Sequence, residues 1–303
     1  MEHALTILGS SSALPTSQRF PSAQVLQMLE RFFLIDCGEG TQMQLRKANI
    51  PFSKIQAVFI SHLHGDHYLG IFGVLSSFNL LGRKTPLKIF APKGFDKIVK
   101  YQLNFLLAEL NFPLLFFDLP LEPYHCIFSD KKIDVYAIQL QHRIATWGFY
   151  FKEKQKEYNV KKEAIELYKL TIPQIVAAKR GEDICIDNYR IIKNDEITLP
   201  PKELKSYAYI SDTIYNPNVS KYLHHVTLLY HEATFLHALL SRAQETYHST
   251  ALQAGEFAAQ CEAQKLLIGH FSARYSSIKE LEIEAQSKFL NTKAVSDLDV
   301  YKF

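Results

Sequence analysis

The chain has few cysteines, a single tryptophan and no long apolar run. Its four cysteines form no CxxC pair, which excludes the usual cysteine zinc site and redox motif; they are Cys37, Cys126, Cys185 and Cys261. The first residues lack the basic start and apolar stretch of a signal peptide. No segment approaches the roughly 18–20 apolar residues that span a membrane. These absences favour a protein of the reducing cytoplasm with no membrane partner.

An excess of one charge is also missing. The 34 Lys and Arg residues nearly balance the 31 Asp and Glu residues, and the formal net charge of +3 permits an anionic partner without requiring one. Charged residues make up 21% and apolar residues 47%, which excludes a disordered chain. A chain of 303 residues fits one large domain or two ordinary ones.

Short apolar segments alternate with segments of helical character in both halves of the chain. Predicted strands include residues 4–9, 55–61, 206–212, 226–234 and 265–272. Predicted helices include residues 40–49, 66–82, 94–110, 250–263 and 276–290. This alternation predicts a layered α/β fold in a single domain, residues 1–303.

Residues 152–198 have a different composition. The segment is first rich in Lys and Glu and then irregular, which predicts an inserted arm that projects from the domain. Long insertions in compact domains are usually functional or disordered.

The segment FISHLHGDHYLG, residues 59–70, places four metal-binding side chains within six positions after a predicted strand. His62 and His64 are two residues apart, so an extended loop lets both point the same way. Asp66 and His67 are adjacent in the sequence, so they cannot easily bind the same metal ion as His62 and His64. The spacing therefore favours two metal ions side by side, while a polar turn with unrelated histidines is the alternative. Imidazole and carboxylate ligands without thiolate suit zinc, and manganese and iron also accept them.

Three further polar residues directly follow apolar strands: His142 after VYAIQLQ, Asp212 after YAYIS and His270 after KLLIG. Strand ends line the sites of α/β folds. Each residue alone is equally well interpreted as a polar group at a strand end, but beside the histidine cluster each becomes a candidate ligand. Asp212 is the best candidate to bridge two ions, because a carboxylate has two oxygens.

The motif HLHGDH followed by YLG, with the later His, Asp and His at strand ends, resembles the metallo-β-lactamase superfamily. This resemblance implies a four-layer αββα sandwich with its site at the strand edges. The segments DCGEGTQ, YHEATF, HST at residues 248–250 and GHFSARY resemble the ribonuclease Z family in particular, over nearly the whole chain outside the arm. Members of that family trim the 3′ end of precursor tRNA.

The resemblance implies two Zn²⁺ per subunit. One would be held by His62, His64, His142 and Asp212, and the other by Asp66, His67, Asp212 and His270. Asp66 would also orient or deprotonate the attacking water. His248 would donate a proton to the leaving 5′ oxygen while Glu232 holds its ring. The alternative for His248 is a polar residue beside a helix capped by Ser249 or Thr250. Asp36 is a candidate hydrogen-bond partner for a ligand histidine, and His231 is a candidate for an additional or supporting site residue.

Four basic residues are candidates for RNA contacts. Arg19 lies in the loop LPTSQRFPS, which matches a family loop that helps to recognise RNA. Arg274 suits a phosphate because its guanidinium is forked and always charged; a surface salt bridge is the alternative. Lys179 and Arg180 lie where family members carry a Gly-Pro segment of the arm, and that Gly-Pro is absent here. Family members dimerise, so the resemblance also implies a homodimer.

The expected activity is therefore that of a cytoplasmic, zinc-dependent endoribonuclease acting on precursor tRNA. It would remove the 3′ trailer and leave a 3′ hydroxyl on the tRNA and a 5′ phosphate on the trailer. One alternative is a hydrolase of the same fold that acts on small phosphodiesters or sulfate esters. The other is an RNA-binding protein with a degenerate site, which the intact set of ligands argues against.

Overall fold

The computed structural model describes residues 3–105, 109–154, 157–186, 190–201 and 203–303. The chain divides into two compact units. The main unit comprises Met1–Ser129, Asp134–Phe151 and Lys205–Phe303, and the inserted unit comprises Asp130–Ile133 and Lys152–Leu204. The expected arm, residues 152–198, falls within the inserted unit.

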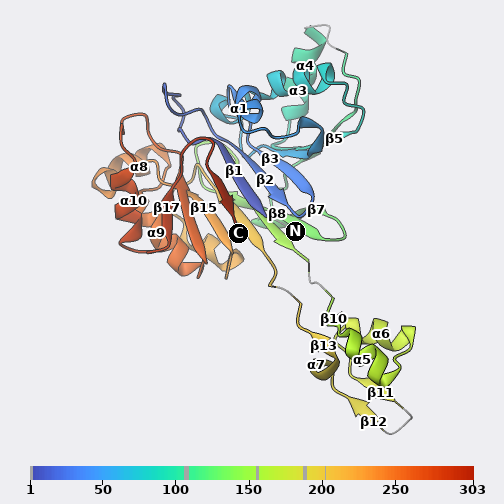
Figure 1. Cartoon of the computed structure of the whole chain (residues 1–303). Coiled ribbons are helices and arrows are strands. Elements are labelled where there is room, and N and C mark those ends of the chain that lie inside the picture. Colours follow the sequence, from blue (N-terminus) through green and yellow to red (C-terminus); the bar gives the residue numbers. More distant parts are fainter. Residues whose placement is uncertain (1–2, 106–108, 155–156, 187–189, 202) are drawn as a thin grey trace. The chain divides into compact units, whose positions relative to one another are not determined.

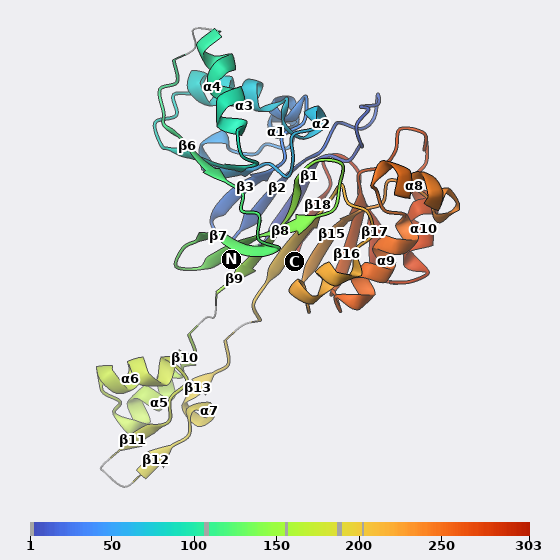
Figure 2. The same cartoon turned by 180° about the vertical axis from the view of Figure 1, so that it is seen from behind.

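The main unit contains two seven-stranded sheets (Figure 1; Figure 2). In spatial order, the first sheet consists of β18 (Val300–Lys302), β1 (Ala4–Gly9), β2 (Ala23–Met28), β3 (Arg31–Ile35), β4 (Ile55–Phe59), β5 (Leu87–Ala91) and β6 (Leu114–Asp118). The second consists of β17 (Thr292–Ala294), β16 (Lys265–Gly269), β15 (Leu228–Glu232), β14 (Ser206–Ile210), β9 (Thr146–Glu153), β8 (Ile133–Leu140) and β7 (Tyr124–Ser129). Strands β3 to β6 are parallel, and so are β14 to β17.

Helices cover the outer face of each sheet (Figure 1). The first sheet packs against α1 (Thr41–Lys47), α3 (Ile71–Leu80) and α4 (Phe95–Phe105) in one apolar cluster. The second packs against α9 (Ala251–Gln260) and α10 (Lys279–Gln286) in another. Shorter helical segments are α2 (Gly65–Tyr68), α8 (Leu240–Thr246), η1 (Phe52–Lys54), η2 (Pro217–Tyr222) and η3 (His237–Leu239). The predicted four-layer α/β sandwich is confirmed.

Aromatic side chains fill the space between the two sheets. Phe33 of β3 and Phe59 of β4 meet Phe151 of β9, with ring centroids 5.4 and 5.2 Å away. All three are fully buried, and each contributes about 1.5–3 kcal/mol by leaving water. Strands that are buried on both faces carry continuous apolar sequences, which explains why IQAVFIS and RFFLI lack alternation.

The single helix expected over residues 66–82 is wrong, because the chain forms two helices that break at Leu69 and Gly70. The amide of Gly70 donates to the Cys37 carbonyl at 2.9 Å. A Cβ atom at Gly70 would lie 2.0 Å from the carbonyl oxygen of Gly38. Only glycine permits this close approach, which packs the loop after β3 against the segment that carries the histidine cluster.

The inserted unit has a small apolar core of its own. It contains β10 (Asn159–Val160) paired with β13 (Thr198–Leu199), β11 (Ile184–Ile186) paired with β12 (Arg190–Ile192), and the helices α5 (Lys162–Tyr168), α6 (Ile172–Lys179) and α7 (Asn194–Ile197). The buried residues of this core are Ala164, Leu170, Ala178, Ile184, Ile192 and Ile197. The expectation of an irregular second half was therefore wrong.

Across the residues that the structure describes, no helix combines the length and the apolar character needed to cross a membrane.

Candidate metal centre

Polar residues from both sheets meet at one edge of the sandwich, where parallel strands end. The residues at these ends are Asp36 after β3, His62 and His64 after β4, Asp212 after β14, Glu232 at the end of β15 and His270 after β16. Asp36, Asp212 and His270 have left-handed backbones, with φ of 53°, 52° and 59°. Such conformations are uncommon outside glycine and cluster at functional sites. Here each one turns the chain sharply as its strand ends.

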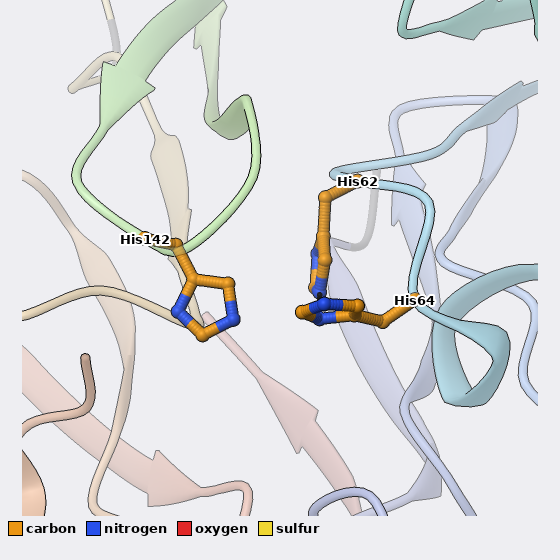
Figure 3. Close-up of side chains that lie close together, drawn as sticks. All are labelled: His62, His64 and His142. Carbon is orange, nitrogen blue, oxygen red and sulfur yellow. Dashed lines mark hydrogen bonds between the residues drawn. The ribbon is translucent and has the colours of Figure 1, made fainter. Parts of the chain in front are cut away.

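Three histidines form the first candidate ligand group (Figure 3). The Nε2 atom of His62 lies 3.0 Å from Nδ1 of His64. His142, from the loop after β8, faces them, with its ring centroid 5.4 Å from that of His62 and 5.1 Å from that of His64. One ring nitrogen from each of the three lies within 4.8 Å of the others, so they can share one ion.

Asp66, His67 and His270 form the second group, and their ligand atoms also lie within 4.8 Å of one another. Asp212 lies between the groups. Its Oδ2 atom is 3.3 Å from Nε2 of both His67 and His270, and its Oδ1 atom is 3.9 Å from Nε2 of His62. The structure thus brings all seven expected ligands together, with one Asp212 oxygen toward each group.

Two buried atoms in this cluster indicate that a cation fits there. Nε2 of His67 and Nε2 of His270 are buried and have no hydrogen-bond partner. A buried polar atom without a partner costs about 1–3 kcal/mol. These nitrogens and Asp212 could hold a metal ion, which would remove that cost. Nitrogen and carboxylate donors without sulfur suit zinc, manganese or iron.

In His67 and His142 the second ring nitrogen makes a hydrogen bond that orients the ring. Nδ1 of His67 donates to Asp36 Oδ2 at 2.7 Å, and Asp36 also accepts from the Ser61 amide at 2.7 Å and the Tyr209 hydroxyl at 2.7 Å. Nδ1 of His142 donates to the Tyr247 carbonyl at 2.9 Å. With Nδ1 committed in this way, Nε2 remains for a metal, as is usual for ligand histidines.

On the second sheet, Thr234 connects the metal cluster to a buried carboxylate. Its hydroxyl lies 3.0 Å from Nδ1 of His270 and donates to Glu232 Oε2 at 2.5 Å. Thr234 and Tyr209 were not singled out from the sequence. Thr234 belongs to the YHEATF segment, so its neighbourhood was a signal, whereas nothing near Tyr209 in sequence indicates Asp36 as its partner.

The partly exposed His248 and the buried Glu232 form a pair beside the cluster. Nδ1 of His248 lies 3.1 Å from Glu232 Oε1, which also accepts from the Thr213 amide at 2.7 Å. Burial lowers the pKa of His248, but the Glu232 carboxylate overcomes this and raises it to about 9. The His248 ring centroid is 5.2 Å from that of His142 and 5.4 Å from that of His270. Thr250, rather than Ser249, caps α9.

A cleft of about 430 Å³ opens above these residues. His64, Asp66, His142, Asp212, His248 and His270 all line it. Three arginines, Arg143, Arg242 and Arg274, also line it and give it positive charge. Arg274 is exposed and lies over the Phe235 ring at 4.9 Å. Sequence reasoning missed Arg143 and Arg242, although Arg143 directly follows a candidate ligand.

Three other expected residues lie elsewhere. Arg19 is only 8% exposed, and its Nη2 atom donates to the Tyr275 carbonyl at 2.7 Å. It therefore connects the N-terminal loop to the segment after His270 and does not reach into the cleft. Lys179, at the end of α6, and the exposed Arg180 belong to the inserted unit.

His231 is not part of the site. Alternate residues of a strand face opposite sides, so His231 points away from Glu232 and packs against Phe257 of α9, with ring centroids 4.9 Å apart. Its Nδ1 atom donates to the Glu232 carbonyl oxygen at 2.7 Å. This corrects the expectation that His231 contributes to the site.

Comparisons with known proteins find relatives that match most of the chain. Residues 3–155 match the family model described as anti-Pycsar protein Apyc1. Ribonuclease Z from Bacteroides fragilis is 42% identical over 288 residues, which cover 95% of each chain. Ribonuclease Z from Cytophaga hutchinsonii is 44% identical over 293 residues, covering 96% of this chain and 93% of the other.

Solved structures share the fold over nearly the whole chain. The human tRNase Z, short form, superposes with a TM-score of 0.72 at 25% identity and covers 98% of both chains. The metallo-β-lactamase fold protein YhfI from Bacillus subtilis superposes with a TM-score of 0.70 at 16% identity over 100% of both chains. The second likeness concerns the fold alone.

Proposed function

The chain belongs to the ribonuclease Z family, and on that premise we propose that it is a metal-dependent endoribonuclease that removes the 3′ trailer from precursor tRNA. It cuts a phosphodiester bond and leaves a 3′ hydroxyl on the tRNA and a 5′ phosphate on the trailer. The observation that carries this proposal is the identity of about 40% to ribonucleases Z over 95% of the chain, with a complete ligand cluster at the strand ends. Action on precursor tRNA fits an enzyme of the cytoplasm.

We assign two Zn²⁺ ions to the cluster of each subunit, in sites that manganese or iron also suits. His62, His64 and His142 would hold one ion, and Asp66, His67 and His270 the other, with Asp212 shared between them. When bound, such ions would lower the pKa of a water molecule toward neutral pH and neutralise charge on the phosphate under attack. The Nε2 atoms of His67 and His270, which are buried beside the Asp212 carboxylate without a hydrogen bond, support this assignment.

The chain's own residues handle the protons. Asp66 borders the cleft and orients the attacking water, whose proton its carboxylate accepts. His248 is protonated at neutral pH because of Glu232, so it can donate a proton to the leaving 5′ oxygen. Glu232 does not react. It holds the His248 ring and stabilises its charge, and it is fixed in turn by the Thr213 amide.

Positively charged residues bind the RNA backbone in this proposal. Arg143, Arg242 and Arg274 all line the cleft. Each arginine that contacts a phosphate adds to the salt dependence of binding. Lys179 and Arg180 of the inserted unit also contact the tRNA in this proposal. Arg19 acts indirectly by holding the segment that carries Arg274 and Tyr275. The protein works as a homodimer, as members of the family do.

The test compares two substrates under the same conditions. One is a precursor tRNA with a 3′ extension, and the other is bis(p-nitrophenyl) phosphate. The proposal expects a single cut after the discriminator nucleotide, lost on chelation and restored by added Zn²⁺. Turnover of the small ester with the tRNA left intact would assign the protein instead to hydrolysis of small phosphodiesters.

A further inference from the structure

A second cavity, of about 520 Å³, lies beside the candidate metal centre. Its walls are mainly apolar, and we call it the apolar pocket. The apolar side chains that form it include Leu63, Leu119, Leu121, Ile144, Ala145 and Trp147. All of them belong to the main unit.

The apolar pocket adjoins the metal centre. His64, a candidate metal ligand, lines both the cleft and the apolar pocket. Leu63 lies between His62 and His64, and Ile144 follows His142 by two residues, so the two loops in Figure 3 that carry the ligands also form the pocket wall. A group in this pocket therefore lies next to whatever the metals bind.

The pocket is formed in advance. Trp147 is only 2% exposed, and its Nε1 atom donates to the Pro120 carbonyl at 2.8 Å. Its amide donates to the Ser61 carbonyl at 3.0 Å, directly before His62. Ligand sites are commonly preformed, apolar clefts with a few fixed polar groups, and this wall is tied to the metal-binding loop itself.

The open side of the pocket exposes apolar groups beside two charged ones. Leu121 is 74% exposed and Ile144 is 37% exposed. Lys93 and Asp118 also line the pocket. A carboxylate repels a phosphate, but it accepts hydrogen bonds from the N–H groups of a base edge, while a lysine donates to base oxygens and nitrogens. A pocket with apolar walls and with Lys93 and Asp118 at its open side therefore suits a flat nucleobase better than the sugar–phosphate backbone.

We propose that the apolar pocket binds a nucleobase of the RNA substrate, from one of the two nucleotides joined by the scissile phosphate. The inference rests on the proposed function, because that function places an RNA phosphodiester at the metals. Those two nucleotides carry the bases nearest to the cleaved bond. The base packs against Leu121 and Ile144 and makes hydrogen bonds to Asp118 and Lys93. These contacts position the scissile phosphate beside the candidate metal ligands.

The test is a double-mutant cycle on precursor tRNA. One set of substrates carries an abasic site at the discriminator nucleotide or at the first trailer nucleotide. The enzyme variants are the double substitution Leu121→Ser with Ile144→Ser, and the control Leu290→Ser. Leu290 is 85% exposed and lines neither cavity. Circular dichroism first shows whether both variants keep the wild-type fold. Ala145→Trp is a second pocket variant, because a tryptophan at this exposed position fills the pocket.

For the wild type, an abasic site at one of the two positions should lower kcat/KM roughly 5- to 100-fold, the range expected for one lost base contact. The pocket variant should show a fall of similar size on the intact substrate and no further fall on that abasic substrate, while the control behaves as the wild type. The inference would be overturned if the abasic site lowered kcat/KM of the pocket variant as much as it lowers that of the wild type. It would also be overturned if neither abasic position lowered kcat/KM of the wild type. A wild type that leaves intact precursor tRNA uncut would instead refute the proposed function, and the inference with it.

Discussion

Replacing Glu232 by glutamine tests the proposed proton donor. Glu232 is fully buried and faces His248 at 3.1 Å. Glutamine keeps the size of the side chain but removes the charge that raises the pKa of His248 to about 9. Without that charge the pKa of His248 falls from about 9 toward the ordinary value of 6.5, because burial lowers it while Asp212 still raises it.

The loss of charge predicts a specific change with pH. If the pKa of His248 reaches 6.5, its protonated fraction at pH 8 falls from roughly 0.9 to roughly 0.03, so cleavage of precursor tRNA should slow by up to about 30-fold. The acid form is present below the pKa, so the alkaline limb of the pH–rate profile should move to lower pH in the variant. Both enzymes would hold the same cations near His248, so the separation between the two alkaline limbs is the quantity to measure.

Two controls distinguish this effect from a loss of structure. Bis(p-nitrophenyl) phosphate releases a phenolate that leaves without a proton, so the variant should retain most of its activity on that ester. Glu282→Gln removes another buried carboxylate, which accepts from the Ala294 amide at 2.8 Å, and should leave the pH profile unchanged. A Glu232→Gln enzyme with the wild-type alkaline limb on tRNA would refute the role assigned to His248.

Three further substitutions test other parts of the site. Asp66→Ala should abolish turnover while the circular dichroism spectrum stays that of the wild type; an active, folded variant would contradict the mechanism. Asp36→Asn should weaken Zn²⁺ binding about 10- to 100-fold, because Asp36 orients His67, and competition with a chelating dye would measure it; unchanged affinity would show that this contact is dispensable. Arg274→Ala should raise KM for tRNA and lower the slope of log KM against log salt by about 0.7–0.9; an equal slope would mean that Arg274 meets no phosphate.

The meeting of the candidate ligands could be predicted because the local sequence pattern and the strand order point to the same place. A parallel strand that ends in a polar residue places it at the edge of its sheet, and Asp212 and His270 follow this rule. The HLHGDH loop brings four candidates on one short segment. Such features depend on near neighbours in the sequence, so the sequence alone reveals them.

Features that depend on distant segments could not be predicted. Tyr209 reaches Asp36 across 173 residues of chain, and nothing close to either residue indicates the contact. The helix break at Gly70 exists because the carbonyl of Gly38 lies against it. The burial of Arg19 likewise depends on the Tyr275 carbonyl, 256 residues further on. In each case tertiary packing overrides the local pattern.

The most direct test of the metal centre is a calorimetric titration of metal-stripped protein with Zn²⁺. Asp212 faces both ligand groups, with its Oδ2 atom 3.3 Å from His67 and its Oδ1 atom 3.9 Å from His62. The wild type should bind two ions per chain, and Asp212→Ala should weaken both binding events. One ion or none per wild-type chain, or an Asp212→Ala titration identical to that of the wild type, would contradict the two-metal centre.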